Sequence, residues 1–233
     1  MPKPVCAVVG VGPGNGAALA RAFAREGMAV ALLARKSEYS NGLANELAGA
    51  RAYSCDAADP QSIAGAFAAI RADLGDPTVL VYNAGSGVRG DAESISLEAF
   101  ENAWRVNALG ALAASQQVIP AMKAAGTGAI VFIGATASFR GGAQAAGFAS
   151  AKAAQRILGE SMARSLGPQG IHVSLIVIDA VVDLPRTRER MPDKPDDFFI
   201  KPDDVAATAV WLTKQPRSAW TFEITIRPFG EKW

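Results

Sequence analysis

Near its start the sequence reads Val5-Cys6-Ala7-Val8-Val9-Gly10-Val11-Gly12-Pro13-Gly14-Asn15-Gly16. The apolar residues at its beginning predict a buried strand, and Leu19 and Phe23, one helical turn apart, predict a helix after it. The glycines in between leave room for a pyrophosphate at the N–H groups that begin this helix, where the helix dipole favours negative charge. The spacing Gly10-xxx-Gly14-x-Gly16 therefore predicts a variant dinucleotide-binding turn. The alternative is a tight turn with a purely structural role.

The composition limits the kind of protein that this chain can be. It has 233 residues, half of them apolar, and a formal net charge of +1. The length suits one domain, predicted over 1–233, and the balanced charge argues against a nucleic-acid surface. Because no apolar run approaches the length that spans a membrane, neither nucleic acid nor membrane is an expected partner. The two cysteines, Cys6 and Cys55, provide no disulfide framework, which favours a cytoplasmic location.

Strand and helix patterns alternate along the rest of the chain. Apolar runs predict further strands at 28–33, 51–54, 78–82, 130–133, 172–178 and 222–226. Helical patterns lie at 40–48, from Asp59-Pro60 onward, from Ser96 to about Ala125 with a break near Glu101, at 148–166, and from Asp203, as the N-cap, to Lys214. Continuously apolar strands are typical of a parallel sheet covered by helices on both faces. The predicted fold is an α/β Rossmann-type, doubly wound parallel sheet of about seven strands.

The segment 183–201 interrupts this alternation. It is charged and contains several prolines, which predicts a mobile loop within the domain rather than a linker between domains. Ligands of doubly wound folds bind at the carboxyl ends of the strands. This loop is therefore expected to cover a substrate pocket.

Several motifs, in their order along the chain, carry a family resemblance. They are the glycine turn, Asp56 after the third predicted strand, Asn83-Ala84-Gly85 after the fourth, Asn107 in a predicted helix, and Lys152 within 148–152. With them the chain resembles the short-chain dehydrogenase/reductase family over essentially its whole length. The resemblance implies an enzyme that moves a hydride between a nicotinamide and a carbonyl or alcohol, and no metal site is expected. The cofactor-binding residues that it implies are Gly10, Gly12, Gly14, Asn15, Gly16, Asp56, Asn83, Ala84, Gly85 and Lys152.

The catalytic positions that the resemblance implies are only partly kept. In the family a tyrosine one turn before the lysine exchanges a proton with the substrate, and a serine after the fifth strand holds the substrate oxygen. Phe148 and Ala135 stand at these positions, and neither a phenyl ring nor a methyl group can do this chemistry. Asn107 and Lys152 remain as candidate catalytic residues. Lys152, or a water that it orders, is the predicted replacement for the tyrosine. A shift of one residue would bring Thr136 into the position of the serine.

The end of the second predicted strand indicates which cofactor the chain prefers. The resemblance implies an acidic residue here for NAD, but the chain has Ala34 followed by Arg35 and Lys36. Two cations without a carboxylate suit a 2′-phosphate, which arginine can bind through two N–H groups. The predicted cofactor is NADP(H), with NAD(H) less favoured. The alternative is that Arg35 and Lys36 are solvated loop charges.

Most of these residues also have structural alternatives. Lys152 could lie on a helix surface, Asn107 could satisfy a buried group, Asp56 could cap a turn, and Asn83 could bridge two strands. The single histidine, His172, is expected to be an ordinary edge or surface residue.

Two functional hypotheses follow from the sequence. The first is an NADP(H)-dependent oxidoreductase with an altered active site, acting on a small apolar carbonyl or alcohol because Phe148 and Ala135 make the catalytic wall apolar. The second is a non-catalytic NADP(H)-binding sensor or hetero-oligomer subunit, because tyrosine and serine are replaced together.

Apolar stripes in two predicted helices bear on the assembly of the protein. Phe100 and Trp104 form one stripe, and Leu158 and Met162 belong to the other. The equivalent helices make dimer contacts in the family that the chain resembles, which predicts a homodimer or homotetramer. A monomer that buries both stripes is the alternative.

Overall fold

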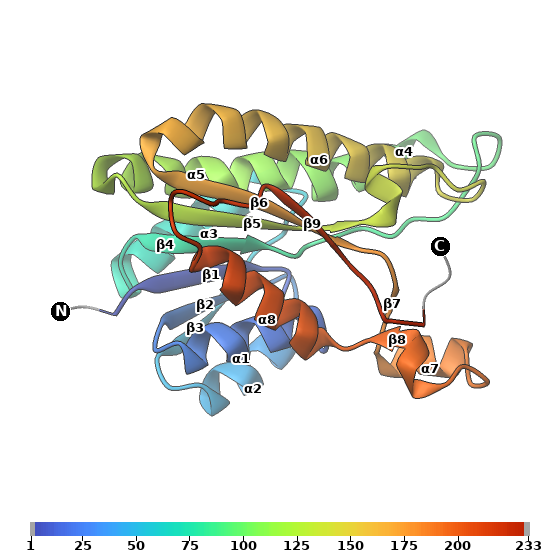
Figure 1. Cartoon of the computed structure of the whole chain (residues 1–233), viewed down its shortest axis with the longest axis horizontal. Coiled ribbons are helices and arrows are strands. Elements are labelled where there is room, and N and C mark those ends of the chain that lie inside the picture. Colours follow the sequence, from blue (N-terminus) through green and yellow to red (C-terminus); the bar gives the residue numbers. More distant parts are fainter. Residues whose placement is uncertain (1–2, 231–233) are drawn as a thin grey trace.

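The computed structural model describes residues 3–230 of the predicted domain, so positions 1, 2 and 231–233 lie outside the described residues. A seven-stranded parallel sheet in the order β3-β2-β1-β4-β5-β6-β9 forms its centre (Figure 1). The strands are β1 Val5–Val9, β2 Ala29–Ala34, β3 Ala50–Ser54, β4 Pro77–Tyr82, β5 Gly128–Ala135, β6 Ile171–Ile178 and β9 Glu223–Ile226. The order reverses between β1 and β4, and doubly wound folds bind ligands at such a reversal. The predicted Rossmann-type fold is confirmed.

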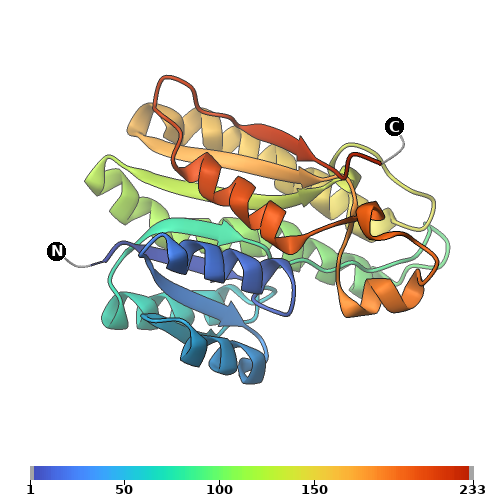
Figure 2. The same ribbon diagram turned by 60° about the horizontal axis from the view of Figure 1, so that its bottom comes forward.

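Helices cover both faces of the sheet (Figures 1 and 2). One face carries α1 Asn15–Arg25, α2 Ser37–Glu46 and α8 Pro202–Thr213; the other carries α3 Pro60–Asp73, α5 Gly110–Ala125 and α6 Ala146–Leu166, with α4 Leu97–Trp104 against α6. The short elements β7 Val181–Val182, α7 Pro185–Arg190 and β8 Phe199–Ile200 lie beyond the carboxyl ends of the main strands. None of the helices within residues 3–230 is long and apolar enough to cross a membrane.

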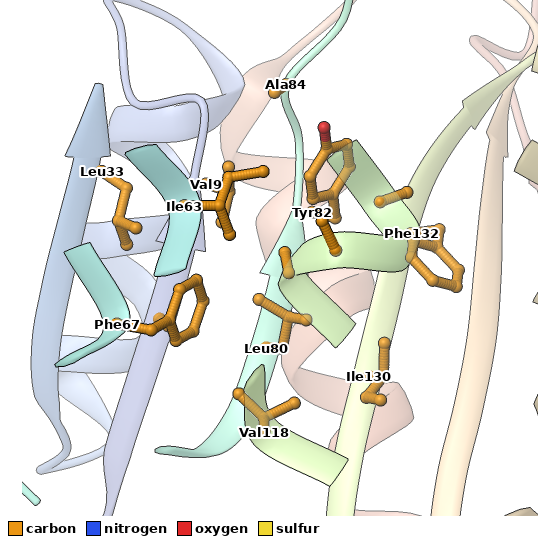
Figure 3. Close-up of a cluster of buried hydrophobic side chains, with 14 of the residues drawn as sticks. Val9, Leu33, Ile63, Phe67, Leu80, Tyr82, Ala84, Val118, Ile130 and Phe132 are labelled. Carbon is orange, nitrogen blue, oxygen red and sulfur yellow. The ribbon is translucent and has the colours of Figure 1, made fainter. Parts of the chain in front are cut away.

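The central strands β1, β2, β4, β5 and β6 are mainly apolar because both faces of the sheet are buried there, whereas the edge strands β3 and β9 carry Arg51 and Glu223. Side chains of successive residues point to opposite faces, so Val9 packs toward α3 and α5 while its neighbour Val8 packs toward α1 and α8. Figure 3 shows the first of these two cores, in which Phe67 of α3, Tyr82 of β4 and Phe132 of β5 are fully buried. Side chains that fill both faces fix the strand register, because a slip by one residue would exchange the two sets.

The long helical region 96–125 breaks later than the sequence predicts. Instead of a break near Glu101, a π-helical turn runs over Arg105–Leu109, between α4 and α5. The Tyr82 hydroxyl donates to the carbonyl oxygen of Val106 at 2.5 Å, and Asn107 Nδ2 donates to that of Ala103 at 2.9 Å. The predicted position was wrong because the partner that satisfies this turn comes from β4, which is distant in the sequence.

Helix capping was predicted correctly at one helix and incorrectly at another. Asp59 caps α3, since its carboxylate accepts a hydrogen bond from the N–H of Gln61 at 2.9 Å. Asp203, in contrast, does not cap α8, which begins at Pro202 with Lys201 at the N-cap position. Proline at the first helical position has a backbone angle already suited to the helix, so this helix begins without a side-chain cap.

The two apolar stripes differ in how far they are buried. Leu158 and Met162 of α6 pack into the core against the sheet, so this stripe is not left over for a partner. Phe100 and Trp104 of α4 remain 37% and 45% exposed. The stripe on α6 is therefore buried within the chain, and the stripe on α4 is the one that stays exposed.

Candidate active site

The glycine turn joins β1 to α1 and packs tightly against the end of β4. Gly10 has a φ of +92°, and a Cβ there would lie 2.5 Å from the backbone nitrogen of Ala84. A Cβ on Gly16 would lie 2.6 Å from the carbonyl oxygen of Gly10. A Cβ on Gly12, however, would meet nothing within 4 Å. Close packing therefore explains Gly10 and Gly16, whereas Gly12 faces open space.

The start of α1 fits an anion. Gly14 stands at its N-cap position, and no side chain forms a capping hydrogen bond. The side-chain oxygen of Asn15 is buried and has no hydrogen-bond partner among the described residues. N–H groups without a side-chain cap suit a phosphate, and an unpartnered acceptor suits a hydroxyl. The turn therefore fits a nucleotide cofactor.

The Asn83-Ala84-Gly85 motif lies beside this turn, at the end of β4. The backbone N–H of Asn83 donates to Val9 O at 2.9 Å, and its Nδ2 donates to Gly10 O at 2.7 Å. Asn83 thus bridges β4 to the glycine turn, which is the structural role that the sequence left open. Ala84 is buried against Gly10, while Gly85 is exposed.

Lys152 is buried in α6, with 4% of its surface exposed. Its Nζ donates to the carbonyl oxygen of Ile133 at 2.8 Å and to Oε1 of Gln155 at 2.9 Å. Burial lowers the pKa of Lys152 to about 7 because desolvation disfavours the charged form. The helix-surface alternative is therefore wrong. Near neutral pH this side chain can exist as an ammonium group or, after losing a proton, as a neutral amine.

Asn107 lies in the π-helical turn and faces Lys152 across Gly85. Its Nδ2 donates to Ser86 O at 3.1 Å and to Ala103 O, so the amide group has a structural role. Its Oδ1 is buried without a hydrogen-bond partner in the part of the chain described. A Cβ on Gly85 would lie 3.3 Å from this Oδ1 and 3.9 Å from Lys152 Nζ. The fold thus brings both candidate catalytic side chains to one point beside the glycine turn.

The apolar residues of the candidate site lie at the ends of β5 and α6. Ala135 ends β5, and Phe148 stands one helical turn before Lys152 in α6, partly buried. Thr136 does not take over the place of Ala135, because its hydroxyl donates to Asp179 Oδ1 at 2.6 Å. The structure therefore gives no support for Thr136 in the position of the missing serine.

The end of β2 presents the two cations that the sequence singled out. Arg35 and Lys36 are exposed, and neither side chain has a hydrogen bond or ion pair within residues 3–230. Asp56, at the end of the adjacent β3, accepts a hydrogen bond from the N–H of Ala58 at 2.9 Å. Asp56 therefore does cap a turn, and the two cations are available to a ligand.

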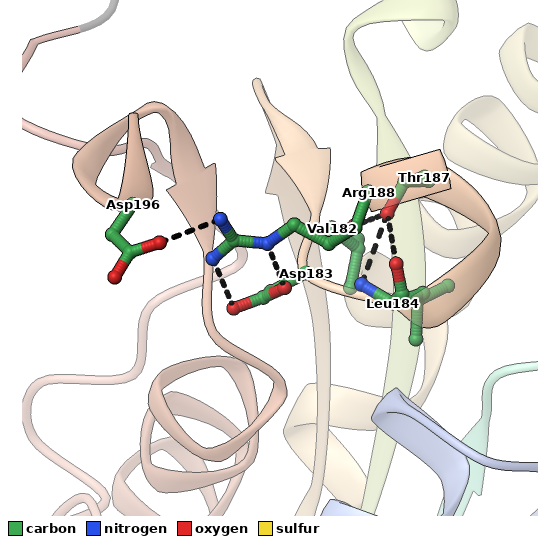
Figure 4. A network of polar contacts seen from close by, with 6 residues as sticks. All are labelled: Val182, Asp183, Leu184, Thr187, Arg188 and Asp196. Atoms are coloured by element: carbon green, nitrogen blue, oxygen red, sulfur yellow. Dashed lines mark hydrogen bonds and ion pairs between the residues drawn. The ribbon is translucent and has the colours of Figure 1, made fainter. Parts of the chain in front are cut away.

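The segment 183–201 has more structure than the sequence suggests. It contains α7, a 3₁₀ turn at Asp196–Phe198, and β8, which pairs with β7. Arg188 binds Asp183 through two hydrogen bonds, of 2.7 and 2.9 Å, and reaches Asp196 Oδ1 at 2.6 Å (Figure 4). The pKa of Asp183 is lowered by its hydrogen bond to Arg188. The sequence showed these charges, but only the fold pairs them.

Leu184 connects this segment to the glycine turn. A Cβ on Gly14, whose φ is +139°, would lie 2.4 Å from Leu184 Cδ2. The backbone N–H of Leu184 is held by the Thr187 hydroxyl at 2.9 Å (Figure 4). The segment therefore contacts the glycine turn through Leu184, and its position over a substrate pocket stays a prediction.

His172 lies at the opposite, amino end of the strands. It is 6% exposed, its ring stacks on Trp220 with centroids 4.8 Å apart, and its Nε2 lies 2.9 Å from Thr221 O. Burial lowers its pKa. The expected edge or surface position is wrong, since Trp220 and Thr221 of the loop before β9 pack against the residue, but it lies away from the candidate site as expected.

Gln155 is a residue of the site that sequence reasoning missed. It is fully buried and contacts both Lys152 and the π-helical turn. A signal was present, because a glutamine three residues after the lysine falls on the same helical face.

Comparison with known proteins identifies the family. The family model described as short chain dehydrogenase matches residues 4–193. The chain belongs to the short-chain dehydrogenase family. It is 34% identical to a short-chain dehydrogenase from Rhodopseudomonas palustris, with a TM-score of 0.83 over 97% of this chain and 99% of that one. A metagenomic short-chain oxidoreductase in complex with NADP is 27% identical, with a TM-score of 0.86 over 99% of each chain.

A curated relative of the family has a named activity. D-threitol dehydrogenase from Mycolicibacterium smegmatis is 30% identical over 220 residues, which are 89% of this chain and 85% of that protein. Short-chain dehydrogenases are oxidoreductases that bind nicotinamide cofactors. Open space at Gly12 and the unpartnered oxygens of Asn15 and Asn107 fit such a cofactor.

Proposed function

We propose that this chain is an NADP(H)-dependent oxidoreductase of the short-chain dehydrogenase type with an altered active site. The observation that carries the proposal is the convergence of Lys152 Nζ and Asn107 Oδ1 on Gly85, beside a glycine turn that fits a nucleotide. Phe148 lies one turn before this lysine, where the family resemblance implies a tyrosine. Residues that bind the cofactor are thus retained, while the usual proton donor is replaced.

Each residue of this site has its own proposed role. Lys152 would bind ribose hydroxyls, and Asn107 Oδ1 would accept a hydrogen bond from a water or hydroxyl. Hydride chemistry would be supplied by the nicotinamide when it is bound. With a pKa of about 7, Lys152 can hold or release a proton at Nζ, so it, or a water that it binds, is the proposed proton donor. Phe148 and Ala135 provide an apolar wall that suits a small apolar carbonyl or alcohol.

The proposed site is tested by restoring the missing groups. In Phe148→Tyr/Ala135→Ser, carbonyl reduction with NADPH is expected to increase about 10²–10⁴-fold, the usual contribution of a positioned acid. Fluorescence titration is expected to give similar NADPH affinities for this variant and the wild type. Phe229→Tyr, which adds a phenol at a residue that is 89% exposed, is the matched control and should not change the rate. A double variant no faster than the wild type would show that the acid is not what is missing.

The preference for NADP(H) is tested at the end of β2. Arg35→Ala is expected to weaken NADPH binding about tenfold or more, because a charge-assisted hydrogen bond to the 2′-phosphate is lost. NADH binding should hardly change. Arg25→Ala removes an exposed arginine from the far end of α1 and serves as the control. Equal affinities of the wild type for NADPH and NADH would contradict the preference.

A second candidate function is a non-catalytic NADP(H)-binding sensor or hetero-oligomer subunit. The replacement of tyrosine and serine by Phe148 and Ala135 favours it. Turnover that saturates with substrate and disappears in Lys152→Met would support the enzyme. NADPH binding with no turnover in the wild type would support the sensor or subunit.

We further propose that the protein acts as a cytoplasmic homodimer or homotetramer. Leu97, Phe100 and Trp104 are exposed on α4 and recur at helical spacing, which suits a contact with a second copy. Cys6 and Cys55 are free and buried, as suits a reducing compartment. Light scattering on the purified protein tests the assembly.

A further inference from the structure

Gln155 joins the two candidate catalytic residues through one side chain. It is fully buried in α6, three residues after Lys152. Its Oε1 accepts a hydrogen bond from Lys152 Nζ at 2.9 Å, and its Nε2 donates to the carbonyl oxygen of Asn107 at 3.0 Å. The amide thus connects the lysine to the π-helical turn.

Only a side chain that both donates and accepts can form this bridge. Lys152 provides N–H donors, so its partner must accept, whereas the carbonyl of Asn107 needs a donor. A buried amide is costly unless its hydrogen bonds are made. A methionine would fill similar space but make neither bond, and a glutamate carboxylate could accept from Lys152 but not donate to Asn107.

We propose that Gln155 is a positioning residue that fixes the Lys152 ammonium group between Ile133 O and the π-helical turn, so that it faces Gly85 and the cofactor site. The role of Lys152 at the cofactor site rests on the proposed function, whereas the geometry of the bridge does not. The bridge also sets how readily Lys152 holds its proton, since both of its acceptors favour the charged form.

The charged groups on the surrounding elements are engaged elsewhere. Arg105 of the π-helical turn binds Glu101 of α4, and Arg156 of α6 binds Glu223 of β9. Strand β5 has no ionisable side chain, and no carboxylate forms an ion pair with Lys152 in the described part of the chain. Ile133 O and Gln155 Oε1 are therefore the groups that offset the burial of the ammonium.

The test follows the titration of Lys152 in the cofactor-free protein by NMR of ¹³Cε-labelled lysine, with Lys152→Met identifying the signal. Gln155→Met is expected to lower the pKa of Lys152 by about 1, because the ammonium group loses an acceptor. Gln155→Glu is expected to raise it by about 1 or more, because a carboxylate favours the charged form. Ser150→Ala is the control, since that hydroxyl bonds only to carbonyls of its own helix, those of Ala146 and Gly147. Its titration should match the wild type.

Two outcomes would overturn the inference. One is an unchanged titration of Lys152 in Gln155→Met; the other is a shift in Ser150→Ala as large as that in Gln155→Met. If Gln155→Met does not fold, Gln155→Glu decides alone, by raising the pKa or leaving it unchanged.

A separate NADPH titration keeps this inference distinct from the proposed function. Shifted lysine titrations in a protein that binds no NADPH would retain Gln155 as a positioning residue and reject the proposed function. Tight NADPH binding with unshifted lysine titrations would retain the proposed function and reject Gln155 as a positioning residue.

Discussion

Gly110→Ala is expected to lower the free energy of unfolding by about 3 kcal/mol, at the upper end of overpacking effects. Gly110 begins α5 directly after the π-helical turn and packs against Ala57 and Tyr82. A Cβ there would lie 2.1 Å from Ala57 O and 2.4 Å from the Tyr82 hydroxyl. Both neighbours are constrained, since Ala57 contributes backbone and the Tyr82 hydroxyl is bonded to Val106 O. The helix would have to move away, and urea unfolding measures the cost.

The matched control is the same substitution in another helix. Gly65 lies exposed inside α3, and a Cβ there would meet nothing within 4 Å. Gly65→Ala is expected to raise the stability by about 0.5–1 kcal/mol, because glycine is a poor helix former. A Gly110→Ala variant as stable as the wild type would mean that α5 is not held this close to Tyr82.

The stability of the wild type is expected to rise with pH, relative to Lys152→Met, by about 3 kcal/mol between pH 7 and 10. In the unfolded chain Lys152 keeps its proton up to its ordinary pKa of 10.5, whereas burial lowers the pKa in the fold to about 7. Between these values the unfolded state binds the additional proton, so raising the pH favours the folded state by up to about 1.4 kcal/mol per pH unit. Below pH 7 both states are protonated and the difference becomes constant.

Urea unfolding of both proteins at several pH values between 6 and 10 measures this effect. Lys123→Met removes an exposed lysine from the end of α5 and is the charge-matched control, whose curve should follow that of the wild type. Parallel curves for the wild type and Lys152→Met would rule out a buried lysine that titrates near neutral pH. The experiment needs no cofactor or substrate, so its outcome does not depend on the proposed function.

The burial of Lys152 is itself informative about function. Methionine could fill similar space without the cost of desolvating an ammonium group. Natural proteins often lose stability where a site needs a strained or charged group. A lysine kept in this position, beside an unpartnered asparagine oxygen, therefore supports the proposed cofactor site more strongly than either residue does alone.

The fold class and the parts of the site that depend on local chemistry could be predicted from the residues alone. The apolar stretches showed which strands are buried, because a strand covered on both faces needs apolar residues at every position. The spacing of Gly10, Gly14 and Gly16 indicated the turn, and the Asp59 cap began α3 as predicted. Lys152 and Asn107 were also identified from the sequence, through the motifs that contain them.

Contacts between segments that are distant in the sequence determine the remaining features of the fold and the candidate site, which could not be predicted. The break at Arg105–Leu109 depends on the Tyr82 hydroxyl, and the order in 183–201 depends on how Arg188 is folded onto two aspartates. Periodicity reports which face of a helix is apolar, but it does not report which atoms meet that face. Only the tertiary structure could therefore bury Lys152, pair it with Gln155 and bring its pKa near neutral, because desolvation is a property of the packed surroundings.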